Sequence, residues 1–171
     1  MTPSEFYKLR EGGDVERAHT LPHIGSYTVG KHTFDMLLLL YHLYPGTPSH
    51  TLVRAILHHD LHERWNGDSP PGMRRRLHSF AKESKFAQEF VDARLGISPT
   101  DLSLNDQKWL RGLDVLELYI WCIDQRVGYG NNHVHVCEQD CATILCENEI
   151  PEQIRAFFSQ LSFMRHGGDC G

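Results

Sequence analysis

TVGKHTFDMLLLLYHL, residues 28–43, is the most strongly apolar stretch of the chain and predicts a helix that ends before Pro45 and Gly46. On both sides of it the signals are again helical, with apolar residues at helical spacing, capping residues at the starts and Gly or Pro at the ends. No alternating strand pattern appears, so the sequence predicts an all-α fold, with one domain over residues 1–171. The expected helices cover about residues 2–11, 28–43, 47–65, 79–95, 103–127, 131–147 and 151–165.

The composition is that of an ordinary globular protein, with 40% hydrophobic and 23% charged residues among 171. The formal net charge of −5 argues against a protein that coats nucleic acid, because such binding requires an excess of Lys and Arg. The longest apolar run, residues 36–41, is far shorter than the roughly 20 residues of a membrane-spanning helix. No secretory signal is visible, and the five cysteines are expected to be free thiols of a cytoplasmic protein.

Histidine is unusually frequent, with 12 residues, and several histidines lie close to carboxylates. His59 and Glu63 are four residues apart, so on one continuous helix they share a face, which suits a metal ion and the water that it activates. Asp60 would lie about 100° further round that helix. His58 and His62 have the same spacing, by which one helix can give two imidazoles to zinc. From spacing alone, both pairs remain open.

His32, on the preceding predicted helix, and Asp114, on a later one, can converge on the same ion as His59 and Asp60. Two neutral imidazoles and two carboxylates balance the charge of a divalent cation. Nitrogen and oxygen donors in this mixture suit zinc, manganese, cobalt or iron better than calcium.

Three segments, in order, resemble the HD-domain phosphohydrolase superfamily, and in particular its small deoxynucleotidases from bacteria and phages. TVGKHTF (28–34) resembles the family's V-x-E-H-S segment, with Lys31 in place of Glu and Thr33 in place of Ser. HDLHERWNGDSP (59–70) closely resembles H-D-x-x-E-x-x-x-G-D-x-P. LDVLEL (113–118) is similar to the later helix that supplies the last metal ligand. The resemblance spans about residues 17–126 and implies an HD-domain helical bundle.

This resemblance implies a metal site and a proton-transfer pair, and it favours His59 over the His58/His62 pair. The metal would be zinc, cobalt or manganese. Glu63 and Asp68 would manage protons, one on the attacking water and the other on the leaving 5′-oxygen. The implied ligands are His32, His59, Asp60 and Asp114.

Two arginines are expected to bind substrate. Arg17 precedes His32 at about the distance where this branch carries a substrate-binding arginine, and a guanidinium fork suits phosphate oxygens. Ala18 stands where relatives place an aromatic residue, so base stacking is not expected there. Arg74, in the basic run Arg74–Arg76, occupies the place where relatives hold a phosphate-binding lysine.

The resemblance also implies the substrate, a small-molecule deoxynucleotide cleaved at its α-phosphorus. The basic run and the phage-like 28–33 segment favour a dATP-type triphosphohydrolase that releases deoxynucleoside and triphosphate, in the host cytoplasm if the chain is phage-encoded. The alternatives are a 5′-deoxyribonucleotidase acting on dNMPs, or an inactive metal-binding signalling or scaffold protein. A homo-oligomer is expected because small enzymes of this branch commonly self-associate.

A second metal site is conceivable further along the chain, where soft ligands occur at short spacing. Cys137 and Cys141 are one helical turn apart, and His133 and His135 precede them. The Cys-x2-Cys pairing typical of structural zinc sites is missing, so incidental thiols on a helix are the favoured interpretation.

Overall fold

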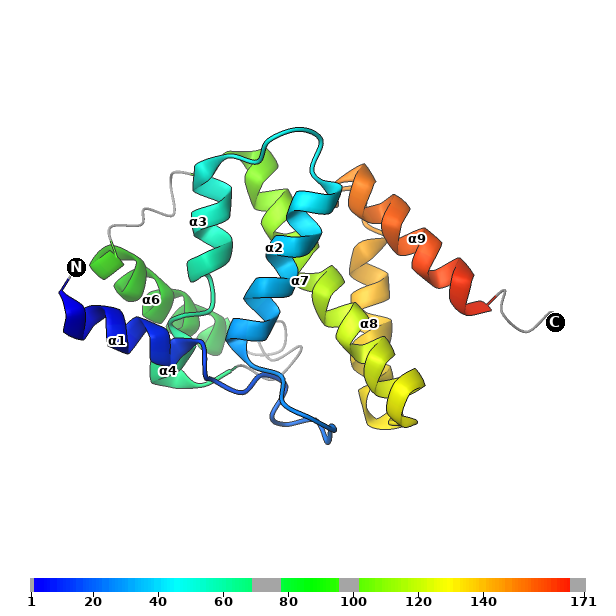
Figure 1. Cartoon of the computed structure of the whole chain (residues 1–171), viewed down its shortest axis with the longest axis horizontal. Helices are drawn as coiled ribbons and strands as arrows, with labels where there is room; N and C mark the ends of the chain where they lie inside the picture. The colour runs from blue at the N-terminus through cyan, green and yellow to red at the C-terminus, as the bar shows by residue number, and fades with distance from the viewer. Residues whose placement is uncertain (1, 69–77, 96–101, 167–171) are drawn as a thin grey trace.

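The computed structural model describes residues 2–68, 78–95 and 102–166. Helix α2 (Val29–Leu43) lies at the centre, in front of the longest helix, α7 (Leu104–Ile123) (Figure 1). The Thr28 side chain caps α2 by accepting from the Lys31 amide, and Ser103 caps α7 by accepting from Asp106. Flanking these two are α3 (His50–His58), α8 (His135–Leu145) and α9 (Glu152–His166). The arrangement confirms the predicted all-α bundle.

The core forms where α2, α3, α7, α8 and α9 meet, and it explains the apolar runs of the sequence. Within the run at 36–41, Met36 and Leu40 are fully buried whereas Leu38 is exposed, as expected for one helical face turned inward. Burial of these side chains supplies most of the driving force for packing. The other fully buried side chains include Leu52, Ile56, Leu113, Leu116, Leu145 and Ile154.

The N-terminal part of the chain covers the other end of the bundle. Helix α1 (Pro3–Gly12) packs on the short α4 (Glu63–Asn66), and α6 (His78–Leu95) follows later in the chain (Figure 1). Directly after α1, the chain passes close to the start of α2, where the Gly30 amide donates to the Gly13 carbonyl at 2.9 Å. A Cβ on Gly30 would lie 3.0 Å from that oxygen, which is tighter than an ordinary contact, so glycine favours this close approach.

Residues 13–28 form an irregular segment that returns to α2. An isolated antiparallel bridge joins Glu16 to Thr28, and the Arg17 amide donates to the Tyr27 carbonyl at 2.7 Å. Within the described residues this bridge is the only β pairing. These bonds place Arg17 beside the start of α2.

The expected helix over 47–65 is wrong in its second half. Helix α3 ends at His58, residues 59–62 form turns, and α4 begins only at Glu63. The amides of Leu61 and Glu63 bond three residues back, to His58 and Asp60, instead of four. The helix expected over 103–127 ends earlier, because α7 passes at Asp124 into a π-helical turn, η2 (Asp124–Gly128). The helix expected over 131–147 begins later, because a 3₁₀ turn, η3 (Asn132–Val134), precedes α8.

None of the helices in the described ranges is long and apolar enough to cross a membrane.

Candidate metal centre

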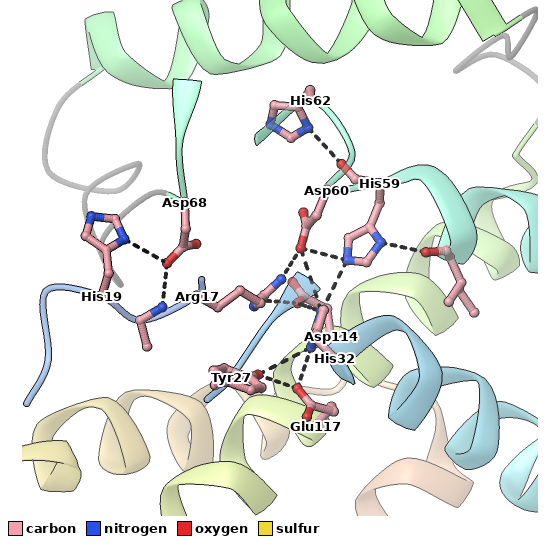
Figure 2. Close-up of polar contacts among 12 residues, drawn as sticks. Arg17, His19, Tyr27, His32, His59, Asp60, His62, Asp68, Asp114 and Glu117 are labelled. Carbon is pink, nitrogen blue, oxygen red and sulfur yellow. Dashed lines mark hydrogen bonds and ion pairs between the residues drawn. The ribbon is translucent and has the colours of Figure 1, made fainter. Parts of the chain in front are cut away.

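Four side chains converge between α2, the turn after α3, and α7 (Figure 2). Each offers one nitrogen or oxygen atom, and these atoms all lie within 4.8 Å of one another. His32 and Asp60 are buried, and the other two are partly buried, so the donor atoms are partly shielded from solvent. The four are the residues expected as ligands: His32, His59, Asp60 and Asp114.

His32 is completely buried and is held from both sides of its ring. Its Nδ1 bonds the carboxylate of Glu117. Its Nε2 lies 3.2 Å from an Asp114 oxygen and 3.7 Å from an Asp60 oxygen. Burial and the charge of Arg17 lower the pKa of His32, but its bonds to Asp114 and Glu117 raise it to about 9, so a metal ion must displace the Nε2 proton while Glu117 holds the proton on Nδ1.

The His59 ring also turns its Nε2 toward the cluster, but a different group bonds its Nδ1. Its Nδ1 lies 2.8 Å from the Ile56 carbonyl, which can only accept, so Nδ1 carries the proton. Its Nε2 lies 3.1 Å from Asp60 and 3.3 Å from Nε2 of His32. The two Nε2 atoms thus face the same space between two carboxylates. This donor set fits a divalent transition metal.

Of the two histidine pairs left open by spacing, only His59 belongs to the group of four. Because the helix ends at His58, residues four apart no longer share a face, and neither His58 nor His62 belongs to the cluster. The His62 ring instead lies 3.0 Å from the His59 carbonyl. The same break turns Asp60 toward His59, and Glu63 lies outside the group of four.

Arg17 supplies positive charge directly at the cluster. Its buried guanidinium pairs with Asp60, and it lies 3.5 Å from an Asp114 oxygen (Figure 2). Burial raises the pKa of Asp60, but the charges of His59 and Arg17 outweigh it and hold the pKa well below its usual range. The pKa of Asp114 is likewise lowered, because its bond to His32 and the charge of Arg17 outweigh burial. Both carboxylates are therefore ionised at neutral pH.

Asp68 behaves differently from these two carboxylates. Burial raises its pKa, only partly opposed by Arg17 and by the Ala18 amide, which donates to the carboxylate at 2.6 Å. Its other neighbour is His19, at 3.8 Å. Asp68 therefore anchors the backbone next to Arg17, where Ala18 adopts a left-handed φ of 52°.

Glu63, the other expected proton-transfer residue, is buried near Arg17. Burial lowers the pKa of Arg17, but the surrounding charges of Asp60, Asp114 and Glu63 raise it well above its usual range. Arg74 lies outside the described residues.

Two residues at the centre were not predicted from sequence. Glu117 and Tyr27 are both buried, and the Tyr27 hydroxyl donates to Glu117 at 2.5 Å. The signal that could have identified Glu117 is its place one turn after Asp114, as the only charged residue in the otherwise apolar stretch 115–123. No local pattern marks Tyr27, because its partner is 90 residues away.

The soft-ligand set near the C-terminus is not assembled. Cys137 and Cys141 are buried on α8 against Cys122 of α7, whereas His133 and His135 are exposed. In the part of the chain that the structure describes, the cluster at His32 is the only group of His, Cys, Asp and Glu residues with metal-binding geometry.

Comparison with known proteins adds no assignment, since no model of a protein family matches the sequence and no curated protein matches it significantly.

Proposed function

We propose that this chain is a metal-dependent phosphohydrolase of the HD type, with His32, His59, Asp60 and Asp114 as ligands of a divalent zinc, cobalt or manganese ion. The observation that carries the proposal is the pair of Nε2 atoms 3.3 Å apart, each with its Nδ1 side engaged elsewhere. Two imidazoles with this orientation, beside two ionised carboxylates, form a site for a cation with affinity for nitrogen.

When bound, such a metal supplies Lewis acidity that activates a water and polarises a phosphoryl oxygen. The chain's own residues supply the rest. Burial raises the pKa of Asp68, the direction that favours a proton donor, and we assign to it the protonation of the leaving 5′-oxygen. Glu63, buried beside Arg17, is then the residue that orients the attacking water or accepts its proton. Arg17 has N–H groups beyond those used by Asp60, and these can bind phosphate oxygens.

The proposed substrate is a deoxynucleotide cleaved at the α-phosphorus, and a dATP-type triphosphate is preferred. This choice rests on the resemblance to HD-domain deoxynucleotidases and on the basic run that includes Arg74. One observation favours the 5′-deoxyribonucleotidase alternative. Arg17 places one cation at the cluster, and one cation is enough for a single phosphate group.

Product analysis distinguishes these reactions. Purified protein is incubated with dATP or dAMP and with Zn²⁺, Co²⁺, Mn²⁺ or EDTA, and the products are separated by ion-exchange chromatography. We expect deoxyadenosine and inorganic triphosphate from dATP, only with metal. Phosphate released from dAMP alone would refute the triphosphohydrolase and support the nucleotidase. Failure to hydrolyse any nucleotide, including cyclic nucleotides and (p)ppGpp, with metal bound would support the scaffold alternative.

A matched pair of variants on α7 tests the ligand assignment. Asp114→Asn removes a proposed ligand, and we expect loss of metal-dependent activity with helix content retained. Asp106→Asn changes a buried carboxylate of the same helix, which accepts a hydrogen bond from Ser49 at 3.1 Å and does not belong to the cluster. This control should keep its activity. Equal losses in the two variants would contradict a specific role for Asp114.

A further inference from the structure

Glu117 is a buried carboxylate that the proposed ligand set does not use, yet it contacts that set directly. It is 3% exposed and bonds Nδ1 of His32. The Tyr27 hydroxyl donates to the same carboxylate oxygen at 2.5 Å (Figure 2). Burying a carboxylate costs free energy unless donors satisfy it, and here both donors come from residues at the centre.

Helix α7 brings the parts of this support together. Asp114 and Glu117 are three residues apart, so both face the centre, one turn after the other. Trp121, one turn further, stacks on the Tyr27 ring with centroids 4.6 Å apart and an interplanar angle of 14°. One face of α7 therefore provides a proposed ligand, the carboxylate behind another ligand, and the platform that fixes the Tyr27 hydroxyl.

A carboxylate behind a histidine has two chemical effects. It accepts the Nδ1 proton, which leaves Nε2 as the only free lone pair, and its charge makes the imidazole a more basic ligand. His59 has only the neutral Ile56 carbonyl in the equivalent place. His32 is thus the more strongly supported of the two imidazoles.

We propose that Glu117 is a positioning residue that, with Tyr27, fixes the tautomer of His32 and strengthens the binding of metals that bind imidazole nitrogen. Such metals include Zn²⁺ and Co²⁺, whereas Mg²⁺ prefers oxygen ligands. The inference rests on the metal centre of the proposed function but not on the reaction or its substrate.

Metal affinity tests this inference without any measurement of hydrolysis. The dissociation constants of Zn²⁺ and Co²⁺ are measured by competition with a chromophoric chelator for the wild type, Glu117→Ala, Glu117→Gln and Tyr27→Phe. Loss of such a support typically weakens binding about 10–100-fold, and we expect this for Glu117→Ala. Glu117→Gln should lose less, because its amide oxygen still accepts from Nδ1. Tyr27→Phe should have the smallest effect.

Glu138→Gln is the matched control. Glu138 is as buried as Glu117 but lies on α8 and pairs with Arg126 at 2.7 Å, outside the cluster. It should leave zinc affinity unchanged. Circular dichroism of the metal-free variants reports on folding, and the nearly isosteric Glu117→Gln keeps the test valid if Glu117→Ala does not fold.

Long-range ¹H–¹⁵N NMR of the zinc-loaded protein provides a signature that a merely structural role would not alter. In the wild type, His32 should show a protonated Nδ1 and a zinc-bound Nε2. In Glu117→Ala, the His32 ring should show a mixture of its two tautomers. The inference is overturned if both Glu117 variants keep wild-type zinc affinity, or if Glu138→Gln loses as much. A wild type that binds zinc through Glu117-supported His32 but hydrolyses nothing would support the inference and refute the proposed reaction.

Discussion

Replacing Arg17 with methionine should destabilise the metal-free protein far more than the metal-loaded protein. The side chains of Arg17 and Asp60 are each only 10% exposed, so their pair is a buried one. Removing one partner of a buried ion pair costs about 3–5 kcal/mol, because the other charge is left uncompensated. Asp114, the second carboxylate near Arg17, is 41% exposed at its side chain and retains some hydration. We therefore expect the lower end, about 3 kcal/mol.

A divalent cation bound by the same carboxylates restores the missing positive charge. Most of the stability that Arg17→Met loses should then be recovered in the presence of metal. The variant should therefore bind metal up to about 100-fold more tightly than the wild type, since each 1.4 kcal/mol is a factor of ten. Thermal unfolding with EDTA or with saturating Zn²⁺ measures the difference. For a domain of this size, about 3 kcal/mol shifts the melting temperature by roughly 6–12 °C.

The control for this experiment is Arg111→Met. Arg111 forms exposed ion pairs with Glu147 and Glu149, which are worth at most about 1 kcal/mol, with or without metal. An Arg17→Met protein that loses the same stability in EDTA and in zinc would refute the reasoning, because Arg17 and the metal would then not neutralise the same carboxylates.

Two further predictions concern packing and pH. Gly30→Ala should lower the free energy of unfolding by about 1–2 kcal/mol in urea titrations, because the clash with the Gly13 carbonyl outweighs the gain in helix propensity. Gly128→Ala is the control and should not lower it, because no atom lies within 4 Å of the added Cβ. Equal effects of the two variants would contradict the packing argument. Burial, followed by the charge of Glu89, raises the pKa of Asp92 to about 6. A raised carboxyl pKa means that folding favours the protonated form, so the native state loses stability as pH rises from about 4 through about 6. Asp92→Asn should therefore stabilise the metal-free protein at pH 7.5 and much less at pH 4, and a gain independent of pH would contradict this origin.

Helix positions were predictable from sequence where the determinants are local. The Thr28 cap and the Pro45–Gly46 pair bound α2 in the sequence and in the structure. The end of α3 was not predictable, because no Gly or Pro stands between His58 and Gly67. Tertiary and ring contacts replace helical bonds there: Asp60 turns to Arg17, and the His59 ring bonds the Ile56 carbonyl.

The candidate site shows the same division. Spacing could not choose between His59 and the His58/His62 pair; the resemblance favoured His59, and the structure brings His59 to the cluster. Glu117 was missed because its role depends on His32, which is 85 residues away in sequence. A carboxylate on a helix has many possible partners, and only the packing of α2 on α7 selects this one.

Crystals of the protein grown with Zn²⁺ and measured on both sides of the zinc absorption edge test the central claim most directly. The account predicts one anomalous peak about 2.0–2.2 Å from Nε2 of His32, from Nε2 of His59 and from carboxylate oxygens of Asp60 and Asp114. A peak at His58 and His62, at the cysteines of α8, or at no protein ligand would contradict it.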